Sequence, residues 1–194
     1  MVCIGMQTTP VSAVECSKEL SQLTSVHAKQ DKDVRTKGMA LSKGLGEPSK
    51  EAKSAVKKVD ETSARFVRDV LRDCGWPKRS KVSDAVLDDF SLLVIHAQDD
   101  RSLQLYALHL MESALVAGDT DGQSFALLTD KVLRAANLPQ RYGTQLDWSF
   151  EVQELENPTE VDARRAALGM PPLSEYVAMV KEYFASLKKN EDAK

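Results

Sequence analysis

Residues 83–100 read SDAVLDDFSLLVIHAQDD, and this stretch decides the predicted fold. Within it, Leu92–Ile95 form an apolar run with no polar side. A helix with such a run is buried on all faces, because no side of it suits water. We therefore predict a central helix from Ser83 to about Gln98, against which the other helices pack.

Apolar residues at helical spacing continue on both sides of this segment. Ser12 and Glu15 have the spacing of a capping box, which predicts a first helix that ends before Gly38. Ser49 can cap a second helix, which Gly75 ends. Further helices are predicted over 100–118 with Asp100 as cap, over 121–136, over 159–168 after an Asn157 cap, and from Tyr176 to Leu187.

The pattern changes near residues 146–153. There Leu146, Trp148, Phe150 and Val152 alternate with polar residues, which is the period of a strand. Short connections elsewhere imply antiparallel neighbouring helices. The predicted fold class is therefore mainly α: an antiparallel helical bundle of about six or seven helices with a short strand or hairpin near 146–153. We expect residues 14–188 to form a single helical domain and residues 189–194 to be a frayed tail.

Composition excludes two classes of protein. The chain has 194 residues, with Lys+Arg 26 against Asp+Glu 29 and a net charge of -3. No surplus of cations is present to neutralise phosphates, so we expect no nucleic-acid partner. No apolar run approaches the ~18 residues that cross a bilayer, so we expect no transmembrane segment.

The cysteines leave the cellular compartment open. Residues 1–13 end in Val11-Ser12-Ala13 and are similar to the tail of a truncated secretory signal. Removing them with Cys3 would leave Cys16 and Cys74, which can pair in an oxidising compartment such as the periplasm. The alternative is a cytoplasmic protein with a disordered N-terminus and unrelated thiols. The even cysteine count favours export, and the spacing predicts no structural metal.

His96 is the first candidate for chemistry. It follows the most apolar run of the chain, where a titratable ring costs energy unless it is paired. Burial favours the neutral imidazole, which can act as a base or contact a ligand. Asp100 and Gln104 follow at spacings that place all three on one side of a helix pair. The structural alternative is a core histidine satisfied by the backbone or by Asp100.

The run Gln140–Gln145 is the second candidate. Arg141 offers a planar fork for a carboxylate or phosphate, and Gly143 allows a turn with exposed amides. Thr144 and Gln145 add neutral donors and acceptors. The alternative is a structural turn in which Arg141 pairs with Asp130 of the preceding helix.

At these residues the chain resembles a bacterial family described as a domain of unknown function. The matching motifs are Gly75-Trp76-Pro77, His96-Ala97 with Asp100 and Gln104, Asp130, Gln140 through Gln145, and Arg164-Arg165 through Pro171-Pro172. Asp31 and Arg35 are similar to the family's acidic-then-arginine helix motif. Two departures are Lys32 and Lys131, where the family usually has glutamine and arginine. The resemblance implies a fold and a site, and it names no reaction.

Together these residues predict one polar cleft between the His96 helix and the Tyr142 loop, because so many polar groups are costly to bury without partners. We expect His96 as acid or base, Asp130 as its orienter or as a clamp, and Arg141 as receptor for a small anionic ligand. Asp100, Gln104, Tyr142, Thr144 and Gln145 would complete the ligand site. No cofactor is expected, and whether the chain is an enzyme stays open. The alternative is an exported binding or immunity-type module that contacts a protein partner, in which the polar network is structural.

Overall fold

A computed structural model describes residues 16, 18–41, 48–147 and 149–192. Across these residues the chain forms seven α-helices and one short 3₁₀ turn, so the mainly α fold class is confirmed. The helices are α1 (Lys18–Leu41), α2 (Lys50–Cys74), α3 (Asp84–His96), α4 (Arg101–Ala117), α5 (Gly122–Ala135), α6 (Val161–Ala167) and α7 (Leu173–Asp192); the 3₁₀ turn η1 is Pro158–Glu160. Every helix in this part of the chain is too short or too polar to span a bilayer.

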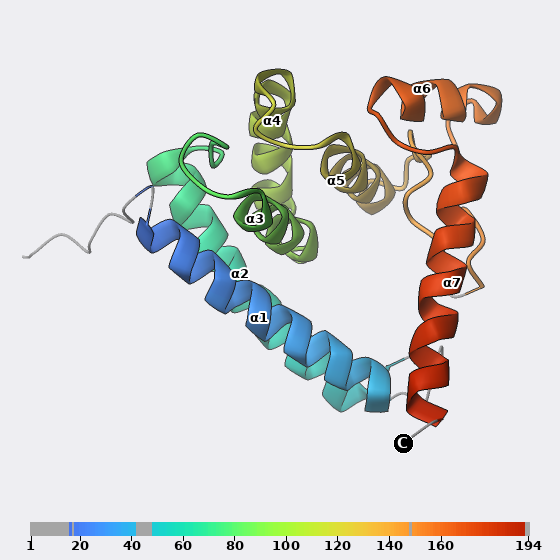
Figure 1. The fold of residues 1–194 in the computed structure, drawn as a ribbon, viewed down its shortest axis with the longest axis horizontal. Helices are drawn as coiled ribbons and strands as arrows, with labels where there is room; N and C mark the ends of the chain where they lie inside the picture. Colours follow the sequence, from blue (N-terminus) through green and yellow to red (C-terminus); the bar gives the residue numbers. More distant parts are fainter. Residues whose placement is uncertain (1–15, 17, 42–47, 148, 193–194) are drawn as a thin grey trace, which may run out of the picture.

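The helices form two groups, α1 with α2 and α6 with α7, and α3 and α5 lie between them (Figure 1). Helices α1 and α2 lie side by side, and α3 packs against both as well as against α4 and α5 (Figure 1). Helix α7 stands on the far side, and the irregular segment 136–157 runs between α5 and the α6–α7 unit (Figure 1). The C-terminal end of α3, which carries His96, therefore faces the space between the two groups.

Helix α3 forms the centre of the core, as predicted. Phe90, Leu93 and Val94 are at most 1% exposed and pack with apolar residues of α2 and α4. Leu92 is 37% exposed, so the prediction of burial on all faces is wrong. Leu92 lies on the strip of α3 that also carries exposed acidic residues and that no other helix covers.

Side-chain caps begin four of the helices. Ser49, Ser83, Asp100 and Asp121 each accept a hydrogen bond from a backbone N–H three residues ahead. These bonds satisfy amides that the first turn of a helix leaves without partners. The predicted caps Ser49 and Asp100 are confirmed, because capping depends on local sequence alone.

One predicted helix end and one predicted helix cap are wrong. Helix α1 continues through Gly38 to Leu41, and Gly38 is buried where a Cβ would lie 3.5 Å from Ala52 of α2. Gly38 therefore lies in the contact between α1 and α2 instead of ending α1. Asn157 makes no side-chain cap, because its backbone is left-handed (φ 43) and its carbonyl accepts the Glu160 amide. Helix α7 extends to Asp192, into the segment expected to fray.

The predicted strand reduces to one antiparallel bridge between Leu146 and Val152. Asp147 ends the extended path, because its Oδ1 accepts from the amides of Ser149 and Glu151 and folds the chain into a turn. Within the described residues no sheet forms. Trp148, the Ser12–Glu15 cap and residues 1–13 lie outside the described residues.

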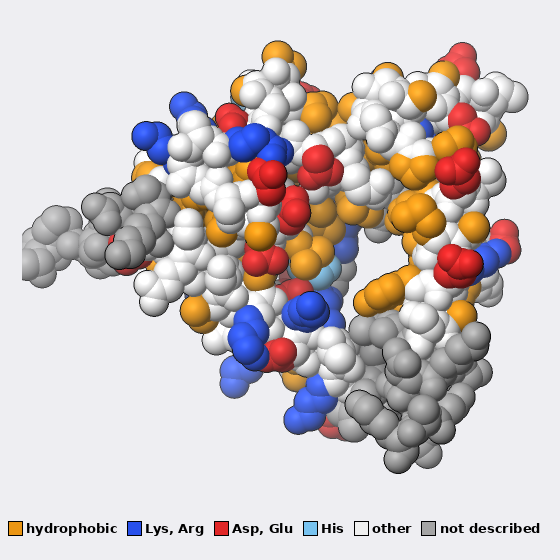
Figure 2. Space-filling view, in the orientation of Figure 1, with side chains coloured by type: hydrophobic (Ala, Val, Ile, Leu, Met, Phe, Trp, Pro, Cys, Tyr) orange, Lys and Arg blue, Asp and Glu red, His pale blue; other side chains and the backbone are white. Residues whose placement is uncertain are grey.

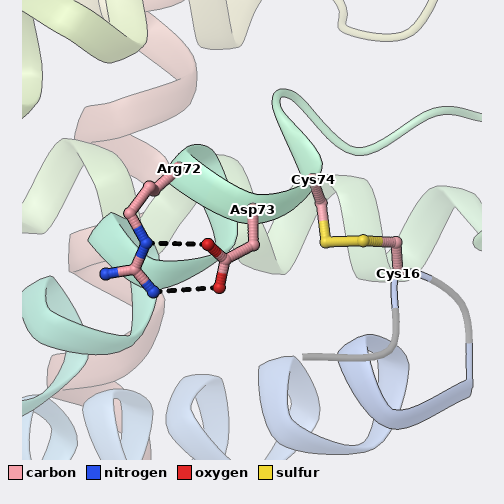
Figure 3. The surroundings of a disulfide bond; sticks show 4 residues. All are labelled: Cys16, Arg72, Asp73 and Cys74. Carbon is pink, nitrogen blue, oxygen red and sulfur yellow. Dashed lines mark hydrogen bonds and ion pairs between the residues drawn. A yellow bond between two sulfur atoms is a disulfide. The ribbon is translucent and has the colours of Figure 1, made fainter. Parts of the chain in front are cut away.

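A disulfide joins the start of α1 to the end of α2. Cys16 and Cys74, separated by 58 residues, are bonded with their Cα atoms 5.7 Å apart (Figure 3). This is the pair that the sequence predicts for an exported chain. The bond holds α1 against the bundle at the end opposite Asp31 and Arg35, with the ion pair of Arg72 and Asp73 beside it (Figure 3).

Candidate functional site

Four ionisable side chains from three helices meet in the interior. Asp31 and Arg35 come from α1, Asp60 from α2 and His96 from α3. Asp31 lies on the buried stripe of α1, since it follows Leu20 at helical spacing, and it is 1% exposed. Contact of α1 with both α2 and α3 brings the four groups together. We call these four residues the ionic cluster.

The closest pair in the ionic cluster is Asp31 and His96. Both carboxylate oxygens of Asp31 lie near Nδ1 of His96, at 3.0 and 2.9 Å. Arg35 Nε lies 2.9 Å from Asp31 Oδ1 and 3.0 Å from the same Nδ1. A proton on Nδ1 suits this geometry, because a bare ring nitrogen would repel both carboxylate oxygens. Arg35 Nε then donates to Asp31, and in the neutral form of this ring the lone pair is on Nε2.

Arg35 also connects the second carboxylate. Its Nη2 donates to Asp60 Oδ1 at 2.5 Å, so one guanidinium bridges two carboxylates. Charge-assisted bonds of this kind fix geometry and stabilise the ionised acceptors. In the described part of the chain, no group of three or more His, Cys, Asp or Glu side chains is arranged to hold a metal ion.

The two acids of the ionic cluster titrate differently. Burial raises the pKa of Asp31, but the hydrogen bond and charge of His96, together with Arg35, outweigh burial and hold this pKa below its ordinary value. For Asp60, burial dominates over the single bond from Arg35, and its pKa is raised. Asp31 is thus the member held as an anion beside His96.

A hollow of about 440 Å³ opens beside the ionic cluster. Figure 2 shows the surface hollowed between the α1–α3 side and α7, with hydrophobic side chains and a histidine at its edge. The hollow is lined from α3 by Ile95 and His96, from α5 by Leu127 and Lys131, from the following loop by Thr144, Gln145, Leu146, Asp147 and Phe150, and from α7 by Tyr176, Val180 and Phe184. Its volume suits a small organic molecule.

Lys131 is the cation of this hollow. Burial lowers its pKa first, and the positive charge of Arg35 lowers it further, whereas Asp60 and Asp31 oppose both effects. Among the described residues no acid lies within ion-pair distance of its ammonium group. A half-buried amine without an acidic contact favours an external anion.

Asp130 organises the loop that forms the opposite wall. Its carboxylate accepts the amides of Arg141, Tyr142 and Thr144 at 2.7, 3.0 and 2.8 Å, and the hydroxyl of Thr144 at 2.9 Å. Asp130 is 0% exposed. The structure therefore places Asp130 under the loop and away from His96. Its contact with Arg141 is made by the backbone and not by the guanidinium.

The other predicted residues are distributed between the hollow and the scaffold. His96, Thr144 and Gln145 share the hollow. Gln104 is buried and donates to the carbonyls of Val94 and Ile95 at the end of α3. The remaining three lie elsewhere: Asp100 caps α4 and pairs with Arg68, Tyr142 packs on Phe125, and the side chain of Arg141 is exposed.

The sequence analysis does not identify the whole ionic cluster. The family resemblance alone points to Asp31 and Arg35, and nothing in the sequence analysis points to Asp60. A local signal existed for Asp60, because it continues the apolar stripe of Ala52 and Val56 on α2. An acid in an apolar stripe indicates a buried charge with a partner. Nothing local identifies that partner.

The chain belongs to a family of unknown function, DUF6624, whose profile matches residues 18–189. The match includes the ionic cluster, the hollow and the Asp130 loop. Neither the curated proteins nor the solved structures give a significant match to this chain.

Proposed function

We propose that the hollow is the active site of a hydrolase or transferase that acts on a small molecule, with His96 as general base. The observation that carries the proposal is the contact of both Asp31 oxygens with His96 Nδ1 at the wall of the hollow. A carboxylate on one ring nitrogen fixes the tautomer and leaves the other nitrogen to take a proton.

Each member of the ionic cluster has a role in this proposal. Nε2 of His96 takes the proton of a water or substrate hydroxyl as that oxygen attacks the carbonyl carbon or phosphorus of the substrate. The imidazolium then gives the proton to the leaving oxygen or nitrogen as its bond to that centre breaks. Asp31 stabilises the imidazolium that forms, and Arg35 holds Asp31 in place. Asp31 and Arg35 are thus positioning residues. General base catalysis of this kind contributes about 10²–10⁴-fold to a rate.

The competing interpretation is a polar network that only fixes helix packing. It requires the cluster to be satisfied internally. In the described residues, however, Nε2 of His96 has no hydrogen-bond partner, and Lys131 beside it has no acidic contact. Two polar groups without a protein partner on one open hollow support a site that binds and reacts.

Chemical modification tests the reactivity of the free ring nitrogen of His96 without a known substrate. Diethyl pyrocarbonate acylates the unprotonated nitrogen of an imidazole, and peptide mass spectrometry separates His96 from His109. We expect His96 to react at about the rate of His109 or faster, although its side chain is only 20% exposed against 78%. Asp31→Asn should slow His96 about 10-fold and leave His109 unchanged. An unreactive His96 would contradict the proposal.

Turnover gives the second test. Wild-type protein and His96→Gln are compared on a panel of chromogenic esters, amides and phosphoesters, with His109→Gln as matched control. We expect at least one substrate class to be turned over, with a loss of about 10²-fold or more in His96→Gln. If His96→Gln chiefly lowers the free energy of unfolding and the wild type turns over none of the panel, the polar network is structural.

We also propose that the protein works in an oxidising compartment, which the Cys16–Cys74 disulfide supports. Protein isolated from its own cells under acid quench is treated with maleimide and digested. We expect Cys16 and Cys74 to remain linked. Alkylation of both at full stoichiometry would place the chain in a reducing compartment instead.

A further inference from the structure

Most polar side chains of the hollow are already engaged by the protein. Thr144 donates to Asp130, Gln145 donates to Thr144 Oγ1 and to the Leu127 carbonyl, and the Tyr176 hydroxyl donates to the Thr144 carbonyl. Asp147 holds the turn at the exposed rim. These groups shape the wall and have little capacity left for a ligand.

Two nitrogens remain, Nε2 of His96 and Nζ of Lys131. Both side chains line the hollow from adjacent helices, α3 and α5. Lys131 also lies near enough to the ionic cluster that Arg35 and both acids influence its charge. The anion that balances Lys131 is not supplied by the described residues. A compact ammonium acts as a point charge, which suits a singly charged group such as a carboxylate.

The opposite wall of the hollow is apolar. Phe150 and Phe184 contact each other with ring centroids 5.4 Å apart, and Val180 lies one turn before Phe184 on α7. These side chains offer a ligand hydrocarbon contact without polar demands. The hollow is therefore amphipathic, with its cation on α5 and its aromatic surface on α7.

The backbone at Phe150 is strained. Its φ of 60 lies in the left-handed region, which a bulky aromatic residue rarely adopts. The Asp147 turn holds this conformation through the bond from the Phe150 amide to the Asp147 carbonyl, 3.0 Å long. The strained residue is one that lines the hollow, and such outliers cluster at ligand sites.

We propose that the ligand of this hollow is a small amphipathic carboxylate, with its anionic head on Lys131 and its hydrocarbon tail against Phe150, Val180 and Phe184. The inference deepens the proposed function and rests on it for the reacting group, since the head would lie beside His96. Arg141, predicted as the anion receptor, is exposed and does not line the hollow.

Three probes separate the head from the tail. Octanoate carries both, acetate carries the head alone, and 1-octanol carries the tail alone. Binding is measured on the full chain by ¹H–¹⁵N chemical-shift titration, which also locates the site. We expect octanoate to bind at least about 10-fold more tightly than either fragment and to shift the amides of Lys131 and Phe184. Equal affinity for octanoate and 1-octanol would overturn the proposal.

Paired variants assign the two ends. Lys131→Met should weaken octanoate about 10-fold or more and leave 1-octanol unchanged, whereas Lys81→Met, an exposed lysine outside the hollow, should change neither. Phe184→Ala should weaken both octanoate and 1-octanol about 10-fold, and Met179→Ala, at an exposed residue of α7 outside the hollow, should change neither. Unchanged octanoate affinity in Lys131→Met would show that the carboxylate head does not bind Lys131.

His96→Gln separates this inference from the proposed function. The variant should retain octanoate binding within about 3-fold, because the head rests on Lys131, while reactivity and turnover are lost. If the wild type binds octanoate but His96 is unreactive, the proposed ligand class stands and the catalytic role of His96 is contradicted. If His96 is reactive but octanoate does not bind, the catalytic role stands and the ligand class is contradicted.

Discussion

Two buried carboxylates, Asp130 and Asp31, are equally removed from water but have different kinds of partner. Asp130 accepts four hydrogen bonds, three from backbone amides of one loop and one from a hydroxyl. Asp31 accepts hydrogen bonds from His96 and Arg35, and both of these side chains can also bond to other groups. Their exposures are 0% and 1%.

The nature of the donors decides what each acid can do. The donors of Asp130 are three backbone amides and one hydroxyl, which hold the shape of its loop. The donors of Asp31 are a permanently charged guanidinium and an imidazole, and only the imidazole can gain or lose a proton. Burial alone therefore does not distinguish the two acids, whereas the type of partner does.

The largest effect is expected from Asp130→Ala. It leaves buried amides of the 141–144 loop without an acceptor, which should lower the free energy of unfolding by roughly 3–5 kcal/mol. Urea unfolding followed by circular dichroism measures the change. The matched control Asp33→Ala, an exposed acid on α1, should cost less than about 0.5 kcal/mol. Similar losses in the two variants would show that the loop does not depend on Asp130.

The next effect concerns the helix that carries Asp31. Replacing both Cys16 and Cys74 by serine should cost about 2–4 kcal/mol, because the unfolded chain loses a closed loop. NMR shifts should change more at His96, which contacts α1, than at Thr144, whose loop contains its own acceptor. Cys3→Ser serves as the control. Equal shift changes at His96 and Thr144 would mean that the disulfide affects the surroundings of Asp31 and Asp130 to the same extent, which would contradict the comparison.

A smaller loss of stability is expected for Asp31→Asn. The amide keeps an acceptor for Arg35, so the free energy of unfolding should fall by only about 1–2 kcal/mol. Asp130→Asn should cost more, because its single remaining acceptor oxygen must replace two that are in use. Urea midpoints of the two variants decide the order, and the reverse order would contradict the comparison.

The smallest effects lie in the pH dependence within the ionic cluster. The folded pKa of Asp31 is below the ordinary 3.8, so its stabilisation is present above that value and is lost as the pH falls through the folded pKa. The folded pKa of Asp60 is above 3.8, so its stabilisation is present below that value and is lost as the pH rises.

Asp31→Asn should therefore reduce the gain of stability with rising pH in the acid range, and Asp60→Asn should increase that gain. Thermal unfolding across this range measures both slopes. Slopes that change in the same direction would show that the two acids titrate as one unit.

The fold was predictable where local chemistry determines it. Ser49 and Asp100 mark helix starts because capping needs only neighbouring residues. Gly38 does not end α1, because the contact of α1 with α2 extends past it, and the sequence of α1 alone does not show that contact. Asp147 shortened the expected strand by binding the amides of its own turn.

The site was predictable only as a set of residue types. His96 stood out by its apolar surroundings, but its partner Asp31 lies 65 positions earlier in the chain. Spacing suggested Asp100 instead, which faces Arg68 and the start of α4. Helix packing decides which guanidinium meets an imidazole, and Arg35 rather than Arg141 does so here.

Gly122 at the start of α5 joins the two sides of the molecule. A Cβ at this position would lie 2.0 Å from the Leu168 carbonyl oxygen, at the end of α6. The Leu168 backbone and its Cβ atom, 2.7 Å from that position, leave no room for a side chain on Gly122. A larger residue at Gly122 must shift the end of α6, and a short link joins α6 to α7, which carries Tyr176 and Phe184. We therefore expect the absence of a side chain at Gly122 to determine how the α7 wall of the hollow is placed.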